Sequence, residues 1–445
     1  MFNVEGPMLL AIIVVMILFL ILLVSKVRLH AFLALIITAV LMGVLTGMEL
    51  PDVVANVTAG FGGLMTHIGI VIALGVIIGQ ILETTGGAEK IANSILRLVG
   101  KERSPLAMGL AGGVVSIPVF CDSGFVILTP IWKAISRVGK VPVMTLSAAL
   151  MAGLLTTHVF VPPTPGPIAA AGILGADLGR VVLYGIIVSI PVILASVAWA
   201  QSGFMKKKFP RYVTEEDIPI TQEEKVKLTP PSTFMSYMPI VVPILLIVAQ
   251  SFGTEYLPEG TTLVDVLAFI GNPAIALLIG TGIAYMLSPR TEEVRDTWIG
   301  RALERSTIII LVTAAAGSFG RILGATGIGD YLGETIAAWG LPGVLLPFLI
   351  AAFILTAQGS ATVAILTAAA VIAPILPSLG ISPEVAVLAV GAGAVTVVHA
   401  NGSYFWVVAK FSDMDIKEGY WAVTSTTLVM GITGLIAVGI LSIFV

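Results

Sequence analysis

Four short polar segments interrupt apolar stretches of the chain, and their residue types suit the binding of a small anion. They run from Ser116 to Gly124, from His158 to Pro167, from Thr356 to Thr362 and from His399 to Ser403. Their prolines and glycines break helices. A helix that starts after such an interruption directs free backbone N–H groups and its positive dipole end toward the gap. The pattern therefore predicts a carboxylate-binding site at these interruptions.

Small polar side chains at the interruptions can add hydrogen bonds to such a ligand. We expect Ser123, Ser360 and Thr362 to donate hydroxyl hydrogens to a carboxylate, each bond contributing about 1 kcal/mol net. Asn401 and Ser403 can meet hydroxyl groups of the same ligand. The alternative for each residue is that it lets helices pack closely in the membrane. The Ser-Gly and Gly-Ser pairs, taken together, favour the binding role.

Asp122 is the only acidic residue in the middle of an apolar stretch. A charge at the centre of a bilayer costs at least about 2.5–3.5 kcal/mol on insertion scales, so such a residue is functional by default. An ionised carboxylate would repel an anionic ligand, whereas burial favours the neutral form of a carboxyl group. We therefore predict that Asp122 carries a coupled proton. The alternative is a structural partner for a nearby backbone or basic group.

Two histidines, His158 and His399, occupy matching positions at two of the interruptions. Either side chain can donate a hydrogen bond to a substrate or titrate near neutral pH. The alternative is that each histidine holds the unwound backbone in place. We count both among the candidate binding residues.

The sequence indicates no catalytic or cofactor chemistry. The glycine-rich runs lack the Lys-Ser/Thr pair of an ATP-binding loop, and no HExxH or CxxC motif is present. The single cysteine, Cys121, excludes an internal disulfide and a multi-cysteine metal site. No basic patch with interleaved aromatic residues suggests nucleic-acid binding. We expect no enzyme activity, cofactor or metal.

The elements that carry these segments are membrane helices. Hydrophobic residues make up 57% of the 445 residues and charged residues 11%, against about 25% charged in a soluble domain. Windows of about 20 apolar residues recur along the chain, and no signal-peptide cleavage pattern follows the first. Continuous apolar segments fall near residues 8–24, 29–47, 61–82, 143–160, 181–201, 236–252, 263–287, 306–325, 385–400 and 420–443. The fold class is therefore an all-α polytopic membrane protein.

An internal repeat divides the chain. The segment Gly79–Gly86 resembles Gly320–Gly327, and the same offset of 241 residues places His158 on His399. Several apolar segments share this offset, which indicates a duplication. We expect two inverted repeats, each of five transmembrane helices plus one re-entrant hairpin. The predicted boundaries are 1–201 for the first repeat (hairpin about 105–131, broken helix about 143–167), 202–235 for a linker, and 236–445 for the second repeat (hairpin about 343–377, broken helix about 385–410).

The basic residues favour one orientation. With the N-terminus outside and five crossings per repeat, 21 of the 23 Lys and Arg residues fall in cytoplasmic loops, as the positive-inside rule requires. The exceptions are Arg180 and Arg321. This arrangement also places the C-terminus outside and the linker in the cytoplasm. Inverted repeats with broken segments in matching positions are typical of alternating-access transporters, in which non-helical backbone lines a cavity.

At these interruptions the chain resembles the gluconate:proton symporter (GntP) family within the larger ion transporter superfamily. The resemblance runs from the first span to the last and is carried by Gly86-Gly-Ala-Glu-Lys-Ile91, Pro162-Pro-x-Pro-Gly-Pro167, Gly359-Ser-Ala-Thr-Val-Ala364 and His399 with Asn401. It implies proton-coupled uptake of sugar acids or related small acids across the bacterial inner membrane. It also implies an elevator-like fold, in which hairpins and broken helices move against a scaffold, and it favours a homodimer. The family's carboxylate in the first hairpin matches Asp122.

Two departures from the family pattern bear on the substrate. Members that take gluconate often have histidine where this chain has Thr164, and aspartate where it has Gly402. Both changes remove a polar or ionisable group near the presumed site, which makes Thr164 a candidate binding residue. They favour a substrate shorter than gluconate, such as a three- or four-carbon acid like glycerate. D-serine or another amino acid is an alternative.

The leading hypothesis is therefore a proton-coupled importer of a small hydroxy-carboxylate or sugar acid. Sodium is a rival coupling ion, because unwound carbonyl groups with Ser, Thr and Asn side chains also suit Na⁺. A passive channel is disfavoured, since a pore would offer rings of like residues. A membrane enzyme is disfavoured because no nucleophile–base pair or metal set is visible.

Overall fold

The computed structural model describes residues 6–213, 230–257, 261–289, 297–327 and 342–445, and this part of the chain contains helices and no strands. The α-helices of the first half are α1 (Gly6–Ser25), α2 (Ala31–Leu45), α3 (Leu50–Thr84), α4 (Gly87–Val99), α5 (Ser104–Val115), α6 (Cys121–Gly139), α7 (Val143–Phe160), α8 (Pro165–Leu174), α9 (Leu178–Ala200) and α10 (Gly203–Lys208). Those of the second half are α11 (Thr233–Tyr256), α12 (Thr262–Ile270), α13 (Pro273–Tyr285), α14 (Ile299–Ala325), α16 (Leu345–Gln358), α17 (Ala361–Ile372), α18 (Pro383–Gly393), α19 (Ser403–Phe411), α20 (Ile416–Gly419) and α21 (Ser425–Leu441). Short 3₁₀ segments, η1 (Lys101–Arg103) and η3 (Ala373–Leu379), and a π-helical segment, η4 (Tyr420–Thr424), complete the described elements.

Seven of the described helices are long and apolar enough to cross a membrane, and the number rises to nine if each of two bent pairs is one span. One bend of 44° divides α3 near its middle, and the other, of 63°, separates α12 from α13. The prediction of an all-helical protein with many apolar spans is confirmed. The count of five crossings and one hairpin per repeat stays a prediction.

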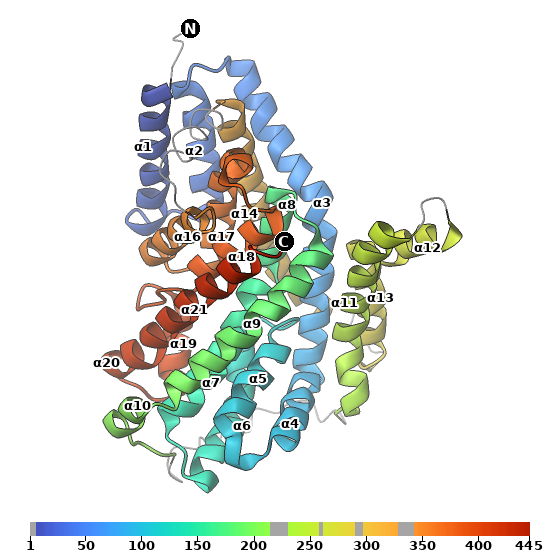
Figure 1. Ribbon diagram of the computed structural model, residues 1–445, viewed down its shortest axis with the longest axis vertical. Helices are drawn as coiled ribbons and strands as arrows, with labels where there is room; N and C mark the ends of the chain where they lie inside the picture. The colour runs from blue at the N-terminus through green and yellow to red at the C-terminus, as the bar shows by residue number, and fades with distance from the viewer. Residues whose placement is uncertain (1–5, 214–229, 258–260, 290–296, 328–341) are drawn as a thin grey trace.

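The helices are arranged around two long contacts between the halves of the chain. α3 packs along α14, and α9 packs along α21. Figure 1 shows α3 running most of the length of the molecule, with α1 and α2 on one side and the α11–α13 arm on the other. The hairpin helices α5 and α16 pack against α7 and α18, respectively.

The two helices that lead into the predicted broken segments form the centre of the molecule. Every residue of α7 is buried, and so is every residue of α18 from Glu384 to Gly393. α18 is rich in alanine, glycine and valine, and α7 carries several alanine, serine and threonine residues with one glycine. Small residues let neighbouring helices approach closely in a membrane. The chain leaves helical geometry at the end of each. The first break is mostly buried, whereas the second begins buried and reaches the surface at Asn401.

Four gaps between helices correspond to the four polar segments. We call residues 116–120, between α5 and α6, the first tip, and Gly359 with Ser360, between α16 and α17, the second tip. The first break is residues 161–164, between α7 and α8, and the second break is residues 394–402, between α18 and α19. The first break is shorter than the prolines suggested. Helix α8 already begins at Pro165, because proline fits the first turn of a helix, where its missing N–H has no acceptor to lose.

The predicted linker, 202–235, is described in part, since its residues 214–229 lie outside the described structure. Its first portion contains α10, and the residues after α10 are hydrogen-bonded to the first half of the chain. The carbonyl of Arg211 accepts the backbone N–H of Val143 at 2.9 Å. The backbone N–H of Val213 donates to Ser136 Oγ at 3.2 Å.

Candidate functional site

The first tip and the first break meet on the same side of α3. An added Cβ at Gly79 would lie 2.0 Å from the carbonyl oxygen of Pro118, and one at Gly75 would lie 3.1 Å from the carbonyl oxygen of Pro163. Glycine at these two positions lets both segments approach the α3 backbone. A small, partly open pocket lies where they meet. Its lining residues are Gly75, Val76, Pro118, Val119, Phe120, His158, Pro163, Thr164 and Pro165.

Asp122 and Ser123 lie in the first turn of α6, directly after the first tip. Oδ1 of Asp122 is buried and has no hydrogen-bond partner among the described residues. No ion pair in the described structure includes this carboxyl group. The structure therefore places an acidic group at the start of a helix without the cation that would normally accompany a buried carboxylate.

His158 and Thr164 flank the first break. His158 lies in the last turn of α7 and is 5% exposed, and its ring centroid is 6.3 Å from that of Phe120 in the first tip. Its Nδ1 atom is buried without a partner in the described structure. Thr164 is the N-cap residue of α8, but its hydroxyl does not cap that helix. It donates instead to the carbonyl of Val161 at 2.7 Å.

The second tip and the second break are also in contact, and again two glycines allow it. A Cβ added at Gly359 would lie 2.8 Å from the backbone of Asn401 and Gly402, and one at Gly402 would lie 2.5 Å from the carbonyl oxygen of Gly359. Gly359 has a φ of +84°, a left-handed conformation that favours glycine. The two backbones therefore touch where the second polar pair was predicted.

His399 and Asn401 of the second break both bond to the second hairpin. His399 Nε2 lies 2.9 Å, and Asn401 Nδ2 3.0 Å, from the carbonyl oxygen of Thr356 in the last turn of α16. Ser403 is the exposed first residue of α19. Ser360 is the N-cap of α17, where its hydroxyl accepts the N–H of Val363 at 3.4 Å. Thr362 follows in the first turn of α17.

The four helix starts are linked across the two halves of the chain. The pocket described above joins the start of α6 to that of α8. α8 then meets α17, since an added Cβ at Gly166 would lie 2.9 Å from Ile365. The glycine contact at the second tip joins α17 to α19. Finally, Tyr404 in the first turn of α19 stacks edge-on against Phe125 of α6, with ring centroids 6.5 Å apart.

This ring of four N-terminal helix ends is electropositive through its backbone. Three of the four helices, α6, α8 and α19, have no side-chain cap on their first N–H groups. Unsatisfied N–H groups and aligned peptide dipoles place roughly half a positive charge at each helix start. In α8 prolines at 165 and 167 leave Gly166 as the main donor of the first turn. The arrangement suits a small anion without any lysine or arginine from the predicted site.

Three features of the site were not predicted from the sequence. They are the glycine pair on α3, the carbonyl of Thr356 as a common acceptor, and Tyr404, whose hydroxyl donates weakly to the carbonyl of Met151 at 3.5 Å. The spacing of Gly75 and Gly79 by four residues was a usable signal, because such residues share a helix face. No local signal identifies the other two.

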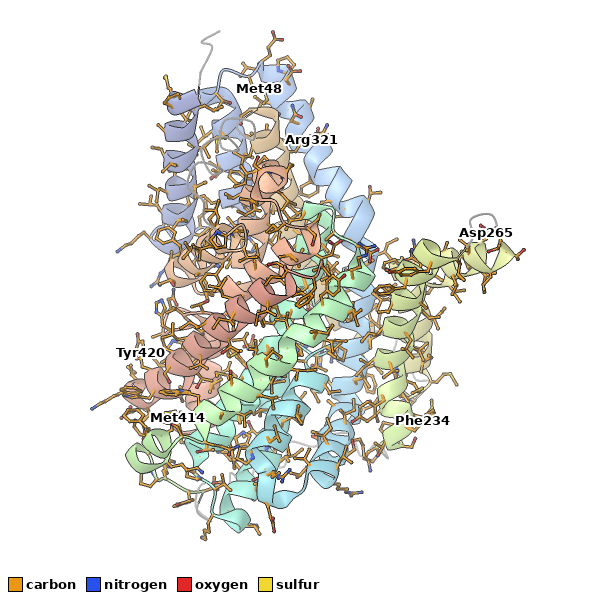
Figure 2. The ribbon with its side chains drawn as sticks, in the orientation of Figure 1. Met48, Phe234, Asp265, Arg321, Met414 and Tyr420 are labelled. Carbon is orange, nitrogen blue, oxygen red and sulfur yellow. The ribbon has the colours of Figure 1, made fainter. Side chains whose placement is uncertain are left out.

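Arg321 lies apart from the site. Its Nε donates to Asn56 Oδ1 at 3.2 Å, across the contact of α14 with α3. Figure 2 shows Arg321 near Met48 at one end of the molecule, opposite the end that carries Met414 and Tyr420. The described residues contain no group of three or more His, Cys, Asp or Glu side chains that could hold a metal ion.

Comparison with known proteins gives a match over almost the whole chain. The family model for GntP family permeases matches residues 8–444. A gluconate permease of Pseudomonas aeruginosa is 32% identical over 430 residues, which cover 95% of this chain and 95% of that protein. The low-affinity gluconate transporter of Escherichia coli K12 is 33% identical over 440 residues, which cover 96% of this chain and 97% of that protein.

A solved structure supports the fold at lower sequence identity. The chain superposes on MtrF of Neisseria gonorrhoeae with a TM-score of 0.67, 17% identity, and coverage of 95% of this chain and 97% of that one. MtrF is described as one of a class of antimetabolite efflux pumps. At this identity the likeness shows the fold alone.

Proposed function

The chain belongs to the GntP permease family, and we propose that it imports a small sugar acid or hydroxy-carboxylate by proton symport. The observation that supports this proposal is the series of contacts that links the starts of α6, α8, α17 and α19, to which we add Asp122, His158, Ser360 and Asn401 as the proposed site residues. The names of the relatives, a gluconate permease and a gluconate transporter, support a sugar acid as the solute class. The solute would be moved and not chemically changed.

The anion would bind between the helix starts. Backbone N–H groups of α6, α17 and α19, with the single donor of α8, would meet the carboxylate, as anions do at helix N-termini. Hydroxyl groups of the solute need both donors and acceptors. Ser123, Ser360, Thr362, Asn401 and Ser403 can supply these, and His158 Nδ1 is a buried atom with no hydrogen-bond partner among the described residues.

Asp122 is the proposed proton carrier. A carboxylate at the same helix start as an anionic solute would repel it, at a cost of several kcal/mol in a medium of low dielectric constant. Protonation removes this repulsion and lets the carboxyl group donate a hydrogen bond. Because Asp122 has no ion-pair partner among the described residues, proton binding breaks no salt bridge in that part of the chain. Proton and solute would therefore bind together, which is the basis of symport.

The proposed transport cycle uses the repeat. We place the two hairpins, α5–α6 and α16–α17, with α7–α8 and α18–α19 in the moving part. The paired packing of α3 with α14 and α9 with α21 supports a duplicated architecture. We propose that the N- and C-termini lie outside, that the linker is cytoplasmic and that two copies form a dimer in the inner membrane.

Uptake into proteoliposomes tests the proposal. Purified protein is reconstituted, an inward proton gradient is imposed, and entry of labelled gluconate, glycerate and D-serine is measured with and without Na⁺. We expect a proton gradient to drive accumulation of at least one acid. Accumulation that required Na⁺ and ignored the proton gradient would contradict proton symport. Preference for glycerate over gluconate would support the role of Thr164 and Gly402 in selecting a shorter acid.

The Asp122→Asn variant tests the carrier. We expect it to lose accumulation driven by the proton gradient while retaining exchange of internal for external solute at equal pH, because only the proton is lost. Asp265→Asn is the matched control, since Asp265 lies at the end of the α11–α13 arm, away from the site (Figure 2). Concentrative uptake by Asp122→Asn at the control rate would remove Asp122 from this role.

A further inference from the structure

The second break is bonded through two side chains to the hairpin that carries the second tip, and the described part of the first half shows no matching pair of bonds. Two side chains of the second break, His399 and Asn401, share one acceptor, the carbonyl of Thr356, at 2.9 and 3.0 Å. A carbonyl oxygen only accepts hydrogen bonds, so His399 must donate its Nε2–H here. Thr356 belongs to the last turn of α16, whose carbonyl groups have no partner within the helix. The second break therefore caps the end of the second hairpin's first helix.

The backbone contact next to these bonds is equally tight. The Cβ position of Gly402 lies 2.5 Å from the carbonyl oxygen of Gly359, so no side chain fits between the tip and the break. The tip residues Gly359 and Ser360 are half-buried, and Thr356 and Asn401 beside them are exposed. A short half-buried turn, joined to the break by one glycine contact with two hydrogen bonds beside it, can separate without disturbing the buried core.

The matching position in the first half is different. There the carbonyl of Gly113, near the end of α5, accepts the hydroxyl of Thr157 at 2.7 Å, and this residue lies inside helix α7 and not in the break. His158, the counterpart of His399, has its Nδ1 buried without a partner in the described structure. The two histidines are therefore in different states. Nδ1 of His158 has no partner among the described residues, whereas Nε2 of His399 is bonded to the last turn of α16.

We propose that the second tip is the access gate of the site and that His399 and Asn401 are its latch. The Nε2–H of His399 and one N–H of the Asn401 amide bind Thr356 when the gate is shut. Those hydrogens cannot bind a solute at the same time. Opening the tip therefore exposes the site and frees two donors in one step. The identity of the solute in this proposal rests on the proposed function. The latch itself rests on the geometry of the hydrogen bonds alone.

Chemical labelling of the tip tests the latch without any solute. A cysteine is introduced by Ala357→Cys on the last turn of α16, and its rate of reaction with a water-soluble maleimide is measured in the full-length protein. The reaction of the native Cys121 is measured in the parent chain, which lacks Ala357→Cys, and is subtracted from the measured rate. Because the two donors share one acceptor, either His399→Ala or Asn401→Ala alone should raise the rate by less than about fivefold, the value of one hydrogen bond. The double variant should raise it by more than the product of the two.

A second variant opens the gate without removing a donor. Gly402→Ala keeps an allowed backbone conformation, since φ is −95° and ψ is 143°, but its methyl group pushes against Gly359. Gly402→Ala should speed labelling at position 357. It should also tighten gluconate binding severalfold, because the closed tip, which does not admit the solute, is less populated relative to the open one. The His399→Ala/Asn401→Ala double variant should speed labelling yet weaken binding. Gly282→Ala, where an added Cβ meets nothing within 4 Å, is the matched control and should change neither.

Two outcomes would overturn the latch. Labelling rates that stay at the control value in both the double variant and Gly402→Ala, with elution profiles showing folded protein, would mean that these contacts do not hold the tip. Weaker gluconate binding by Gly402→Ala would mean that the closed tip forms the site and does not compete with it. If the wild-type chain binds no gluconate, the proposed solute is wrong, and the labelling result still decides the latch.

Discussion

Replacement of Gly79 by alanine tests whether the first tip works in contact with α3. The added Cβ would lie 2.0 Å from the carbonyl oxygen of Pro118, whereas ordinary contacts begin at 3.4 Å. The neighbour is backbone and not the end of a flexible side chain, so the first tip would have to retreat by about 1.4 Å, the difference of those distances. Asp122 and Ser123 follow the tip directly and would move with it.

The size of the effect follows from the cost of overpacking. Forcing extra volume into a close contact costs about 1–3 kcal/mol, which lowers the population of the native tip geometry by about fivefold to 150-fold. We therefore expect the affinity for gluconate to fall by at least about fivefold. The measurement is equilibrium binding of labelled gluconate to purified protein, with initial uptake rates in proteoliposomes beside it.

Gly69→Ala provides a control on the same helix, because an added Cβ there meets nothing within 4 Å. It should bind and transport as the wild-type chain does. Equal affinities in the two variants, both folded by thermal unfolding, would refute the inference that the first tip lies against α3 in the working protein. A loss in both would point to glycine-dependent bending of α3 and not to the tip contact.

Three further predictions address individual interactions. Ser360→Ala removes the N-cap of α17, at a cost of about 0.5–2 kcal/mol, and should weaken gluconate binding several-fold in the same assay. Ser360→Asn can still cap the helix and should recover most of that affinity. An equal loss of affinity in both variants would indicate a direct contact of Ser360 with the solute. Thr157→Val leaves the buried carbonyl of Gly113 unpaired and should lower the thermal unfolding midpoint, at about 1–3 kcal/mol, and an unchanged midpoint would contradict that hydrogen bond. Asp413→Asn weakens a partly exposed pair with Lys133 at 3.2 Å and should change stability by less than about 1 kcal/mol. A larger loss would show that the cluster of Asp413, Lys133 and Arg211 organises the start of the linker.

The sequence alone located the helices and most of their interruptions, because both are consequences of local chemistry. A membrane helix is set by the hydrophobicity of its own window of residues. A helix break is likewise set by the residue at that position and its near neighbours, here Pro118, Gly359 and Gly402. The extent of the first break was predicted less well. Proline can either end a helix or open the next one, and Pro165 does the latter.

The partners of the polar residues were beyond sequence reasoning. Asn401 was expected to meet a solute, yet its amide donates to Thr356, 45 residues away in the chain. Asp122 was expected to be buried, but only the folded chain could show that Oδ1 has no partner among the described residues. These outcomes depend on which backbone another helix brings within about 3 Å, and no local pattern encodes that distance.

What the sequence determined by itself is thus the class of protein and the chain positions where helices stop, both set by hydrophobicity and backbone geometry. The tertiary structure decided how the helix starts meet. It joined α6 to α19 and α8 to α17 across the two halves and brought glycines 75, 79, 359 and 402 against other backbones. It also bonded Nε2 of His399 to Thr356 but left Nδ1 of His158 without a partner among the described residues. Long-range packing determines each of these contacts, because each depends on residues far apart in the chain that approach only once the buried helices α7 and α18 have found their neighbours.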